Sequence, residues 1–393
     1  MEVNGTIVKG FATGIGLMLA CSARADLTVD VIGPTDITFE GLFQADKNYF
    51  NNDFDRVDRR LMTAAERSSQ TLVDDAGMRR AELILKGRTV VTDWSVSYEA
   101  RADRWLDVFF RQRLGSFSNW RLGQFKQNNS LEELSSTRHN DFVAKASTTS
   151  AFAVARRLGA EVATGGDPWT LTGSIFNREI TNNGQKSSGY SVRGTFTPIM
   201  QIAAPDNDAD RVLHLGLSMV GFDPSKNKQR LSVRPQADLA NIRLIDTLSL
   251  NDVTDARQLG LEAMWLQGPL KVSAEWVDAS YQRSVNPDYR ASSWYVSGVY
   301  NLTGEKFRYR TGIYTLPIPA VEAGMWQVGA RYSHINANDG LVKGGKQDVA
   351  TIGVNWYWRL NFKFMLNYSA VKSTRGAFVN DPDVLELRAQ MTL

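Results

Sequence analysis

The chain has 393 residues, a formal net charge of +3 and 22% charged residues. This composition excludes a helical membrane protein, because no apolar run after Ala25 approaches the roughly 20 residues that a transmembrane helix needs. The small net charge also lacks the basic excess that is typical of proteins that bind nucleic acids.

The first 25 residues have the pattern of a secretory signal peptide. Lys9 precedes an apolar stretch at 11–20, and Ala23-Arg24-Ala25 provides the small-residue motif at which such peptides are cleaved. A lipoprotein signal with Cys21 as the acylated residue is the alternative, and either signal directs the protein out of the cytoplasm. Cys21 is the only cysteine, so residues 26–393 contain no disulfide framework, Cys-based metal site or thiol nucleophile.

Most of the remaining chain alternates between apolar and polar residues, which predicts β-strands. The alternation is found at 94–100, 169–175, 190–196, 213–219, 259–265, 270–276, 294–300, 326–332, 350–370 and 385–393. Some links between these segments are short, such as 90–93 and 267–269. Others are long and polar, at 46–77, 127–155, 223–257 and 336–347.

The segment from Ala350 to Ala370 is too long for one strand of a soluble domain, so we expect it to fold back near its middle. Its alternation keeps the same phase throughout, which requires a turn with an odd number of residues. We therefore predict a three-residue turn at 359–361, with Trp358 opposite Phe362. Lys363 then lies on the polar face.

These patterns predict an all-β fold. We expect residues 26–393 to form a transmembrane antiparallel β-barrel with short periplasmic turns and long extracellular loops. The sheet must close because hydrocarbon cannot satisfy the backbone groups of an open edge. About 23 residues per strand and connection give about 16 strands, a size that encloses an aqueous channel. A soluble sandwich or β-helix, with the apolar residues facing a core, is the alternative.

Several stretches, in order along the chain, resemble the phosphate-selective porin O/P family of Gram-negative outer membranes. They include GLFQADKNYF, MRRAELILKG, LGQFKQNNSLEELSS, VRPQADLANIRLIDT, WLQGPLKVSAEW and LRAQMTL. The resemblance implies a 16-stranded homotrimeric barrel in outer-membrane lipid. It also implies passive diffusion of inorganic anions such as phosphate and pyrophosphate, without a catalytic residue, metal or cofactor.

In this family a long loop folds into the barrel and narrows it, and the resemblance places that loop at 127–155. Ser135 and Ser136 match a hydroxyl pair that helps to hold the anion, and Lys145 matches a basic residue that follows. Glu133 is a departure, because the best phosphate binders have a lysine near this place and a carboxylate repels phosphate. The other candidates in and beside this loop are Lys126, Arg138, Arg156 and Arg157. Because Arg156 and Arg157 are adjacent, we expect only one of them to face inward.

The long basic loop at 223–257 contains KQRLSVRPQ, which resembles a run of arginines that leads anions inward in the family. Arg230 and Arg234 match its outer members, and Ser232 replaces the middle one. Arg193, Arg331 and Lys363 fall on the polar faces of their strands, so we expect them to line the channel. Pairing with a neighbouring carboxylate is the alternative for each of them.

The sequence therefore predicts an anion-preferring diffusion channel of the outer membrane, with phosphate or polyphosphate as the expected substrate. A general or sugar-permeable porin with little phosphate specificity is the alternative. We do not expect an enzyme, because none of the three histidines, His139, His214 and His334, lies in a recognisable catalytic motif. His139 lies in the expected constriction loop, where it could make the pore sensitive to pH.

Overall fold

The computed structural model describes residues 27–31, 35–54, 71–166, 168–181, 187–203, 207–315, 317, 324–359, 361–376 and 378–393. The predicted signal peptide at 1–25 lies outside these ranges. No helix within them has the length and apolar character that crossing a membrane requires.

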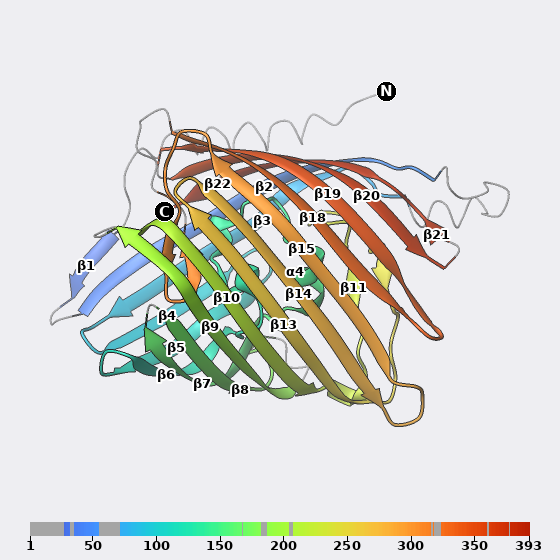
Figure 1. The fold of residues 1–393 in the computed structure, drawn as a ribbon, viewed down its shortest axis with the longest axis horizontal. Helices are drawn as coiled ribbons and strands as arrows, with labels where there is room; N and C mark the ends of the chain where they lie inside the picture. The colour runs from blue at the N-terminus through green and yellow to red at the C-terminus, as the bar shows by residue number, and fades with distance from the viewer. Residues whose placement is uncertain are drawn as a thin grey trace.

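Within these ranges, sixteen antiparallel strands close into one barrel, which confirms the predicted fold class (Figure 1). The strands are β2 (Thr35–Asn51), β3 (Asp75–Arg88), β4 (Thr92–Glu99), β5 (Arg104–Leu114), β6 (Ser118–Lys126), β7 (Arg156–Gly166), β8 (Trp169–Phe176), β9 (Ser188–Ala203), β10 (Asp208–Asp223), β13 (Val253–Gln267), β14 (Leu270–Arg283), β15 (Tyr289–Asn301), β18 (Met325–Asp339), β19 (Val342–Trp358), β20 (Phe362–Arg375) and β22 (Asp383–Thr392). The last strand pairs with the first in a register that includes Ala45↔Ala389, so this sheet has no open edge.

Short strands and helices complete the described structure. β1 (Leu27–Val31) pairs with the beginning of β2. The links between spanning strands contain α3 (Leu131–Leu134), η1 (Thr137–His139), α4 (Ser147–Phe152), η2 (Ser225–Asn227), β11 (Ser232–Val233), β12 (Ile245–Asp246), β16 (Arg308–Arg310), β17 (Ile313–Thr315) and β21 (Phe378–Val379).

The two ends of the barrel differ in the length of their links. At the end where β2 begins and β22 ends, most links have two to four residues, such as 89–91, 115–117 and 268–269. The opposite end has the long links 52–74, 127–155 and 224–252. Short turns face the periplasm in outer-membrane barrels, which gives the orientation used below.

The prediction of a long loop at 336–347 is wrong. β18 continues to Asp339 and β19 begins at Val342, with Asn338 paired to Lys343. Gly340 has a φ of +51°, a left-handed conformation that suits a tight turn. The polar residues that looked like a loop belong to strand ends that extend beyond the apolar band.

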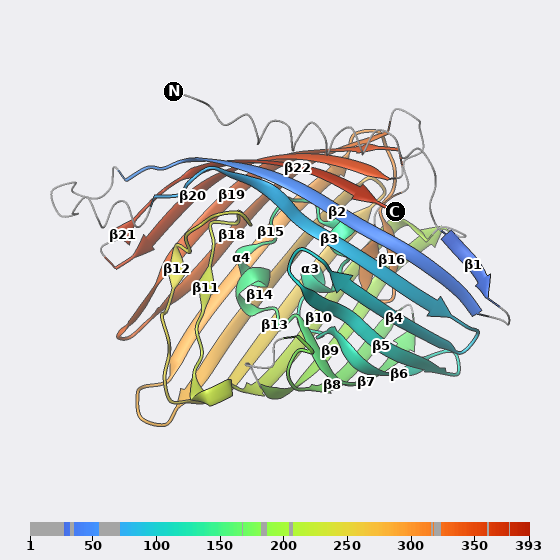
Figure 2. The same ribbon diagram turned by 180° about the vertical axis from the view of Figure 1, so that it is seen from behind.

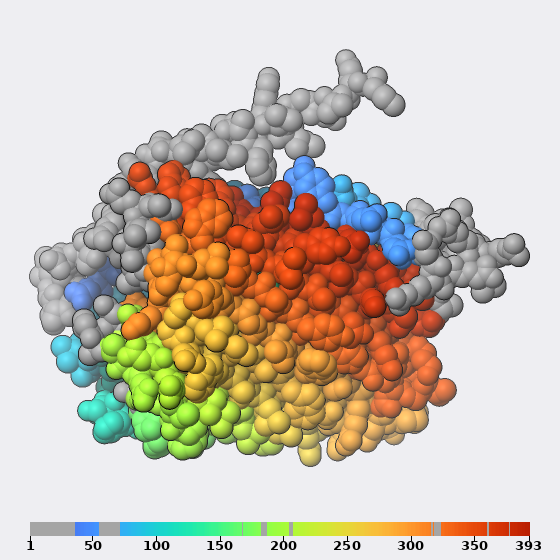
Figure 3. Space-filling view, turned by 45° about the horizontal axis from the view of Figure 1, so that its top comes forward, coloured from blue at the N-terminus to red at the C-terminus, as the bar shows by residue number. Residues whose placement is uncertain are grey.

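The barrel is apolar outside and polar inside, as the alternation predicts. On β19 and β20, Ile352 is 62% exposed and Leu366 43%, whereas Thr351 and Asn367 are buried. Trp358 pairs with Phe362 across a three-residue link, which confirms the predicted hairpin. Figure 3 shows the outer surface of the later strands as a continuous wall, in chain order from green to red.

Three links fold into the barrel, where the sequence predicts one. The link 127–155 brings in α3 and α4, the link 224–252 brings in β11 and β12, and the periplasmic link 302–324 brings in the β16–β17 hairpin (Figure 2). One buried cluster joins Phe152 and Ile245 to Tyr281, Tyr289 and Ile335 of the wall. A second joins Leu131 and Phe142 to Phe307, Tyr309, Tyr314 and the wall residues Met264 and Leu266. The inner face of β13–β15 and β18 is therefore packed rather than open.

Candidate functional site

The open part of the interior follows the wall from β3 to β7, where three cavities adjoin. The extracellular cavity has a volume of about 280 Å³ and reaches Asp238 of the link 224–252. The central cavity has about 600 Å³, and the periplasmic cavity has about 670 Å³ and reaches Gly115 of a short turn. The first two share Thr137 and Arg156, and the last two share Arg111 and Arg121 among other residues. Together they run from one end of the barrel to the other.

A β-bulge places two consecutive arginines in the extracellular cavity. Gln44 of β2 pairs with Arg80 and Ala45 pairs with Met78, so Arg79 is an extra residue in β3. A bulge lets neighbouring side chains escape strict alternation between the two faces. Arg79 and Arg80 therefore both line the extracellular cavity.

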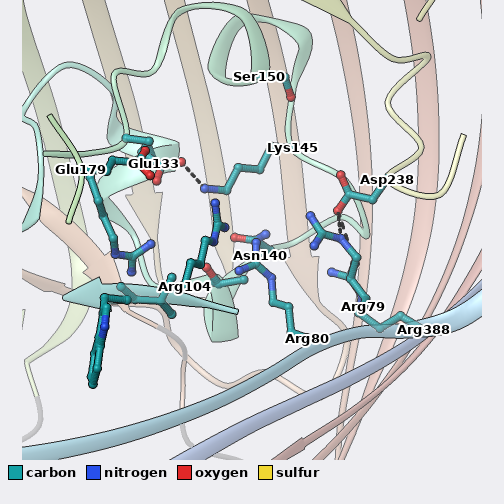
Figure 4. Close-up of a pocket in the computed structure, with 15 residues that line it drawn as sticks. Arg79, Arg80, Arg104, Glu133, Asn140, Lys145, Ser150, Glu179, Asp238 and Arg388 are labelled. Carbon is teal, nitrogen blue, oxygen red and sulfur yellow. Dashed lines mark hydrogen bonds and ion pairs between the residues drawn. The ribbon is translucent and has the colours of Figure 1, made fainter. Parts of the chain in front are cut away.

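Asp238 organises the cations in this cavity. Its carboxylate lies 2.8 Å from Arg79 Nε and 3.7 Å from Arg388 Nη2 (Figure 4). Burial alone would raise the pKa of Asp238, but the two guanidinium groups outweigh it and lower the pKa to about 2. Arg388 also forms two hydrogen bonds of 2.6–2.7 Å with Asp46. The acid therefore stays charged and fixes two arginines beside the open space.

Glu133 lies in the constriction loop, the name used here for residues 127–155, and holds Lys145 of that loop and Lys126 at the end of β6. Lys145 Nζ forms an ion pair with its carboxylate, and Lys126 Nζ lies 3.7 Å from the other oxygen and 2.5 Å from the Glu133 carbonyl oxygen. Burial alone would raise the pKa of Glu133, but Lys145 and Lys126 lower it to about 2. Glu133 thus neutralises part of the charge that these predicted site residues carry.

The predicted hydroxyl pair is divided between two environments. Ser135 is buried, and its Oγ donates to the Leu131 carbonyl oxygen at 2.9 Å, which completes the turn of α3. Ser136 lines the central cavity, and its Oγ accepts from Arg138 N at 3.4 Å at the beginning of η1. Arg138 lines the same cavity, with Nη2 2.8 Å from Glu40. The structure therefore brings Ser136 and Arg138 to the open space and ties the Ser135 hydroxyl to the helix.

We expect only one of Arg156 and Arg157 to face inward, and the two contact different partners. Arg156 lines the extracellular and central cavities, and its Nη2 lies 2.7 Å from Asp107. Arg157 Nη1 lies 2.8 Å from Glu179.

Arg331 and Lys363 lie beneath the constriction loop and are buried. Arg331 Nη2 donates to the Ala144 carbonyl oxygen at 3.0 Å and to Gln236 at 2.6 Å. Lys363 Nζ donates to the Asn140 carbonyl oxygen at 2.5 Å. Neither residue is among those that line the three cavities in the described part of the chain. Both are on the predicted inward face, but the loop stands between them and the open space.

Arg193 connects the wall to the inserted β16–β17 hairpin. Its Nη2 lies 2.5 Å from Glu262 and 2.8 Å from the Gly312 carbonyl oxygen. His214 contacts the same Glu262 and the Tyr309 hydroxyl, each at 2.9 Å. Arg193 also lines the periplasmic cavity, so it lies at the boundary between packed and open interior.

The profile of the family described as phosphate-selective porin O and P matches residues 43–393. The chain belongs to this family. Porin O of Pseudomonas aeruginosa is 23% identical over 259 residues, which cover 58% of this chain and 58% of that protein. An uncharacterised protein of Caulobacter vibrioides is 29% identical over 282 residues, which cover 67% of this chain and 55% of that protein. This porin thus spans a little over half the length of these curated relatives.

Solved structures of outer-membrane barrels share the fold of this porin. OmpT of Vibrio cholerae has a TM-score of 0.55 at 11% identity, covering 93% of this chain and 100% of that one. The channel DcaP of Acinetobacter baumannii has a TM-score of 0.56 at 12% identity, covering 93% and 99%. The anion-selective porin from Comamonas acidovorans has a TM-score of 0.52 at 11% identity, covering 91% and 100%. With its family, this fold makes the protein an outer-membrane β-barrel.

The two arginines of the predicted ladder lie in the extracellular link 224–252 of this porin. Arg230 forms hydrogen bonds of 2.8 and 2.5 Å with Asp246. Arg234 Nε donates to the Ala240 carbonyl oxygen at 2.8 Å. Neither lines the three cavities, again within the described residues.

Sequence reasoning missed Arg79, Arg80 and Arg104 of the extracellular cavity and Arg88, Arg111 and Arg121 further along the wall. The doublet Arg79-Arg80 was visible as an interruption of the alternation in MRRAELI. Arg104, Arg111 and Arg121 lie on the short strands β5 and β6, where a few alternating residues give a weak signal, and Arg88 is the last residue of β3.

Proposed function

We propose that this porin is a passive diffusion channel that prefers anions, and that the three adjoining cavities form its path. Its fold and family support a channel rather than an enzyme. Channels work by the shape and charge of the lining, so the residues of the path take the place of a catalytic site.

The charge of the lining is the observation that carries this proposal. Among the described residues, six basic side chains face three acidic ones in the extracellular cavity, and seven face four in the central cavity. In the periplasmic cavity six arginines face only Asp93 and Glu161. A surplus of cations in a narrow, low-dielectric passage attracts anions and repels cations.

Phosphate or polyphosphate is the substrate that we favour, with weak binding. Guanidinium groups bind oxyanions through paired hydrogen bonds, which suits phosphate better than chloride. However, Glu133, Asp238 and Asp93 each hold at least two of the path's cations, and these carboxylates compete with any entering anion. That competition also supports the alternative, a general porin with little phosphate specificity.

We include a homotrimer in the proposal, on the strength of the family and of the uneven wall. The spanning strands β4 to β8 have only 8–11 residues, whereas β9, β10 and β13 have 15–16. A neighbouring copy can cover a wall that is shorter than the rest. Chemical cross-linking in outer-membrane vesicles measures the copy number.

The test of anion preference is the reversal potential of single channels in a potassium chloride gradient. We expect the sign that corresponds to chloride permeation, and a reversal potential of the opposite sign would overturn the proposal. Adding phosphate to the same bath then measures specificity for phosphate, because a phosphate ion bound in the channel reduces the chloride current. Equal currents with and without millimolar phosphate, together with rapid sugar flux into proteoliposomes, would favour the general porin.

A further inference from the structure

The short wall carries a row of charges at one level. The strand registers pair Arg88 of β3 with Asp93 of β4, Asp93 with Arg111 of β5, Arg111 with Arg121 of β6, and Arg121 with Glu161 of β7. Residues directly opposite one another in a sheet have Cβ atoms about 5 Å apart. The five side chains therefore form a band across five strands in the periplasmic half of the open space.

Arg111 and Arg121 are direct neighbours in this row, and like charges in that position repel. Their carboxylates lie on the outer sides of the pair: Arg111 Nε is 2.9 Å from Asp93, and Arg121 Nη2 is 2.6 Å from Glu161. No carboxylate of the described residues forms an ion pair that bridges the two guanidinium groups. The space between them is therefore electropositive.

Arg121 also has unused hydrogen-bonding capacity. Its Nε atom is buried and makes no well-aligned hydrogen bond to any acceptor that the structure describes, whereas Arg111 Nε is 2.9 Å from Asp93. The Arg121 guanidinium is fixed in place, because its centre lies 3.9 Å from the centre of the Phe125 ring. A buried donor without an acceptor is costly, and an entering oxyanion would satisfy it.

Two apolar side chains line the same space as the row. Leu134 of the constriction loop and Ile313 of the β16–β17 hairpin line both the central and the periplasmic cavity, as Arg111 and Arg121 do. Side chains that exclude water raise the strength of charge–charge attraction at this level of the barrel.

We infer that Arg111 and Arg121 together form an anion-binding station that takes an oxyanion of two or more negative charges, such as divalent phosphate or pyrophosphate. The anion bridges the two guanidinium groups, and Asp93 and Glu161 compete with it from either side. This competition keeps the residence time of the anion short, as conduction requires. The inference deepens the proposed function and rests on it, since anions must first reach the periplasmic half of the path.

Asp93 limits the affinity of the station for an anion, because it pairs with the same arginines. Its two oxygens hold Arg111 and, at 2.7 Å, Arg113, and Arg88 lies 3.9 Å away. Removing this carboxylate releases the guanidinium groups toward the open space. Asp93→Asn and Arg121→Gln should therefore shift anion binding in opposite directions.

The test measures block of the chloride current by inorganic pyrophosphate added on the periplasmic side of channels in planar bilayers. We expect Arg121→Gln to raise the half-blocking concentration by about tenfold, since one or more charge-assisted hydrogen bonds are lost. Arg121→Lys keeps the charge but not the planar fork, and we expect an intermediate loss. Asp93→Asn should lower the half-blocking concentration several-fold.

Arg310→Gln is the matched control, because Arg310 lines the same cavity from the inserted hairpin but is not in the row. We expect a change of less than about twofold, from long-range charge alone. An equal loss in Arg310→Gln and Arg121→Gln would overturn the station, because the charge of the whole cavity would then account for binding. Unchanged block in Arg121→Gln would overturn it as well.

The reversal potential in the same membranes separates this inference from the proposed function. Cation preference in the wild-type channel refutes the proposed function itself. Anion preference with pyrophosphate block that is the same in the wild type, Arg121→Gln and Asp93→Asn refutes the station alone.

Discussion

Replacing Glu133 by glutamine should convert the constriction from a weak to a strong phosphate site. In the wild-type channel the Glu133 carboxylate forms a close ion pair with Lys145. Its other oxygen lies 3.7 Å from Lys126 Nζ. Glutamine has nearly the same size and keeps the backbone carbonyl that Lys126 also contacts. The substitution therefore releases two ammonium groups without leaving a gap in the loop.

The size of the effect follows from what phosphate gains. A hydrogen bond to a charged group contributes about 1.5–3 kcal/mol, which corresponds to roughly a tenfold to hundredfold increase in affinity. The side chains of Lys126 and Lys145 are only 12% and 17% exposed, so solvent screens these contacts less than those of surface lysines. We expect the half-blocking concentration of phosphate to fall at least tenfold and the anion-to-cation permeability ratio to rise.

Acid cannot reproduce this change within the ordinary range of pH. The lysines lower the pKa of Glu133 to about 2, so the carboxylate remains charged from pH 4 to pH 8. Because this pKa is below the value in an unfolded chain, the ion pairs stabilise the fold above about pH 4.5. That contribution is lost only as the pH falls toward 2.

The assay is phosphate block of chloride current in single channels of the wild type and Glu133→Gln at pH 7. Glu179→Gln is the control, because Glu179 lines the same cavity but pairs with Arg157. Unchanged block in Glu133→Gln would refute the reasoning, as would an equal gain in the control. A gain in the wild type on acidification from pH 7 to pH 4 would refute the assigned charge of Glu133.

Three further predictions concern the wall, the constriction loop and pH. Ile352→Arg on the lipid face should lower the urea midpoint of unfolding in vesicles by an amount that corresponds to about 2–4 kcal/mol, whereas Leu341→Arg in the 92% exposed turn should not. Lys271 Nζ lies 2.7 Å from the carboxylate of Asp141 in the constriction loop, and Lys271→Met leaves that buried carboxylate unpaired at a cost of about 3–5 kcal/mol. We therefore expect the loop to be less firmly held and the single-channel current to be noisier, and a steady current would contradict this. Burial and neighbouring cations lower the pKa of His139 to about 3, so His139→Gln and the wild type should show the same conductance change between pH 5 and pH 7.

The barrel was predictable because lipid and water impose opposite demands on alternate residues of each strand. The phase of that alternation also determined the odd turn after Trp358, and the observed pairing with Phe362 confirms it. The alternation does not reveal which loops fold into the barrel and cover its inner face. Arg331 and Lys363 lie on the predicted face, but only the fold of the constriction loop decides whether that face is covered.

A second signal in the sequence indicated the covered half and went unused. In β13, Met264 and Leu266 are buried on the inner face between outward residues such as Trp265. Apolar residues on both faces of a strand mean that the inner face packs against protein rather than water. The same argument identifies the open half, where the inward positions of β5 and β6 include Arg111, Arg121 and Arg113.

The open half is organised around carboxylates that each gather several cations. Asp238 holds Arg79 and Arg388, Glu133 holds two lysines, and Asp93 holds two arginines with a third nearby. Each carboxylate occupies a place that a passing anion could take, so the cations need not reorganise when an anion arrives. An anion that binds these cations competes with a carboxylate that is fixed beside them, and this competition promotes release of the anion. This arrangement favours throughput over affinity, so removing one carboxylate should tighten anion binding and delay the release of the anion.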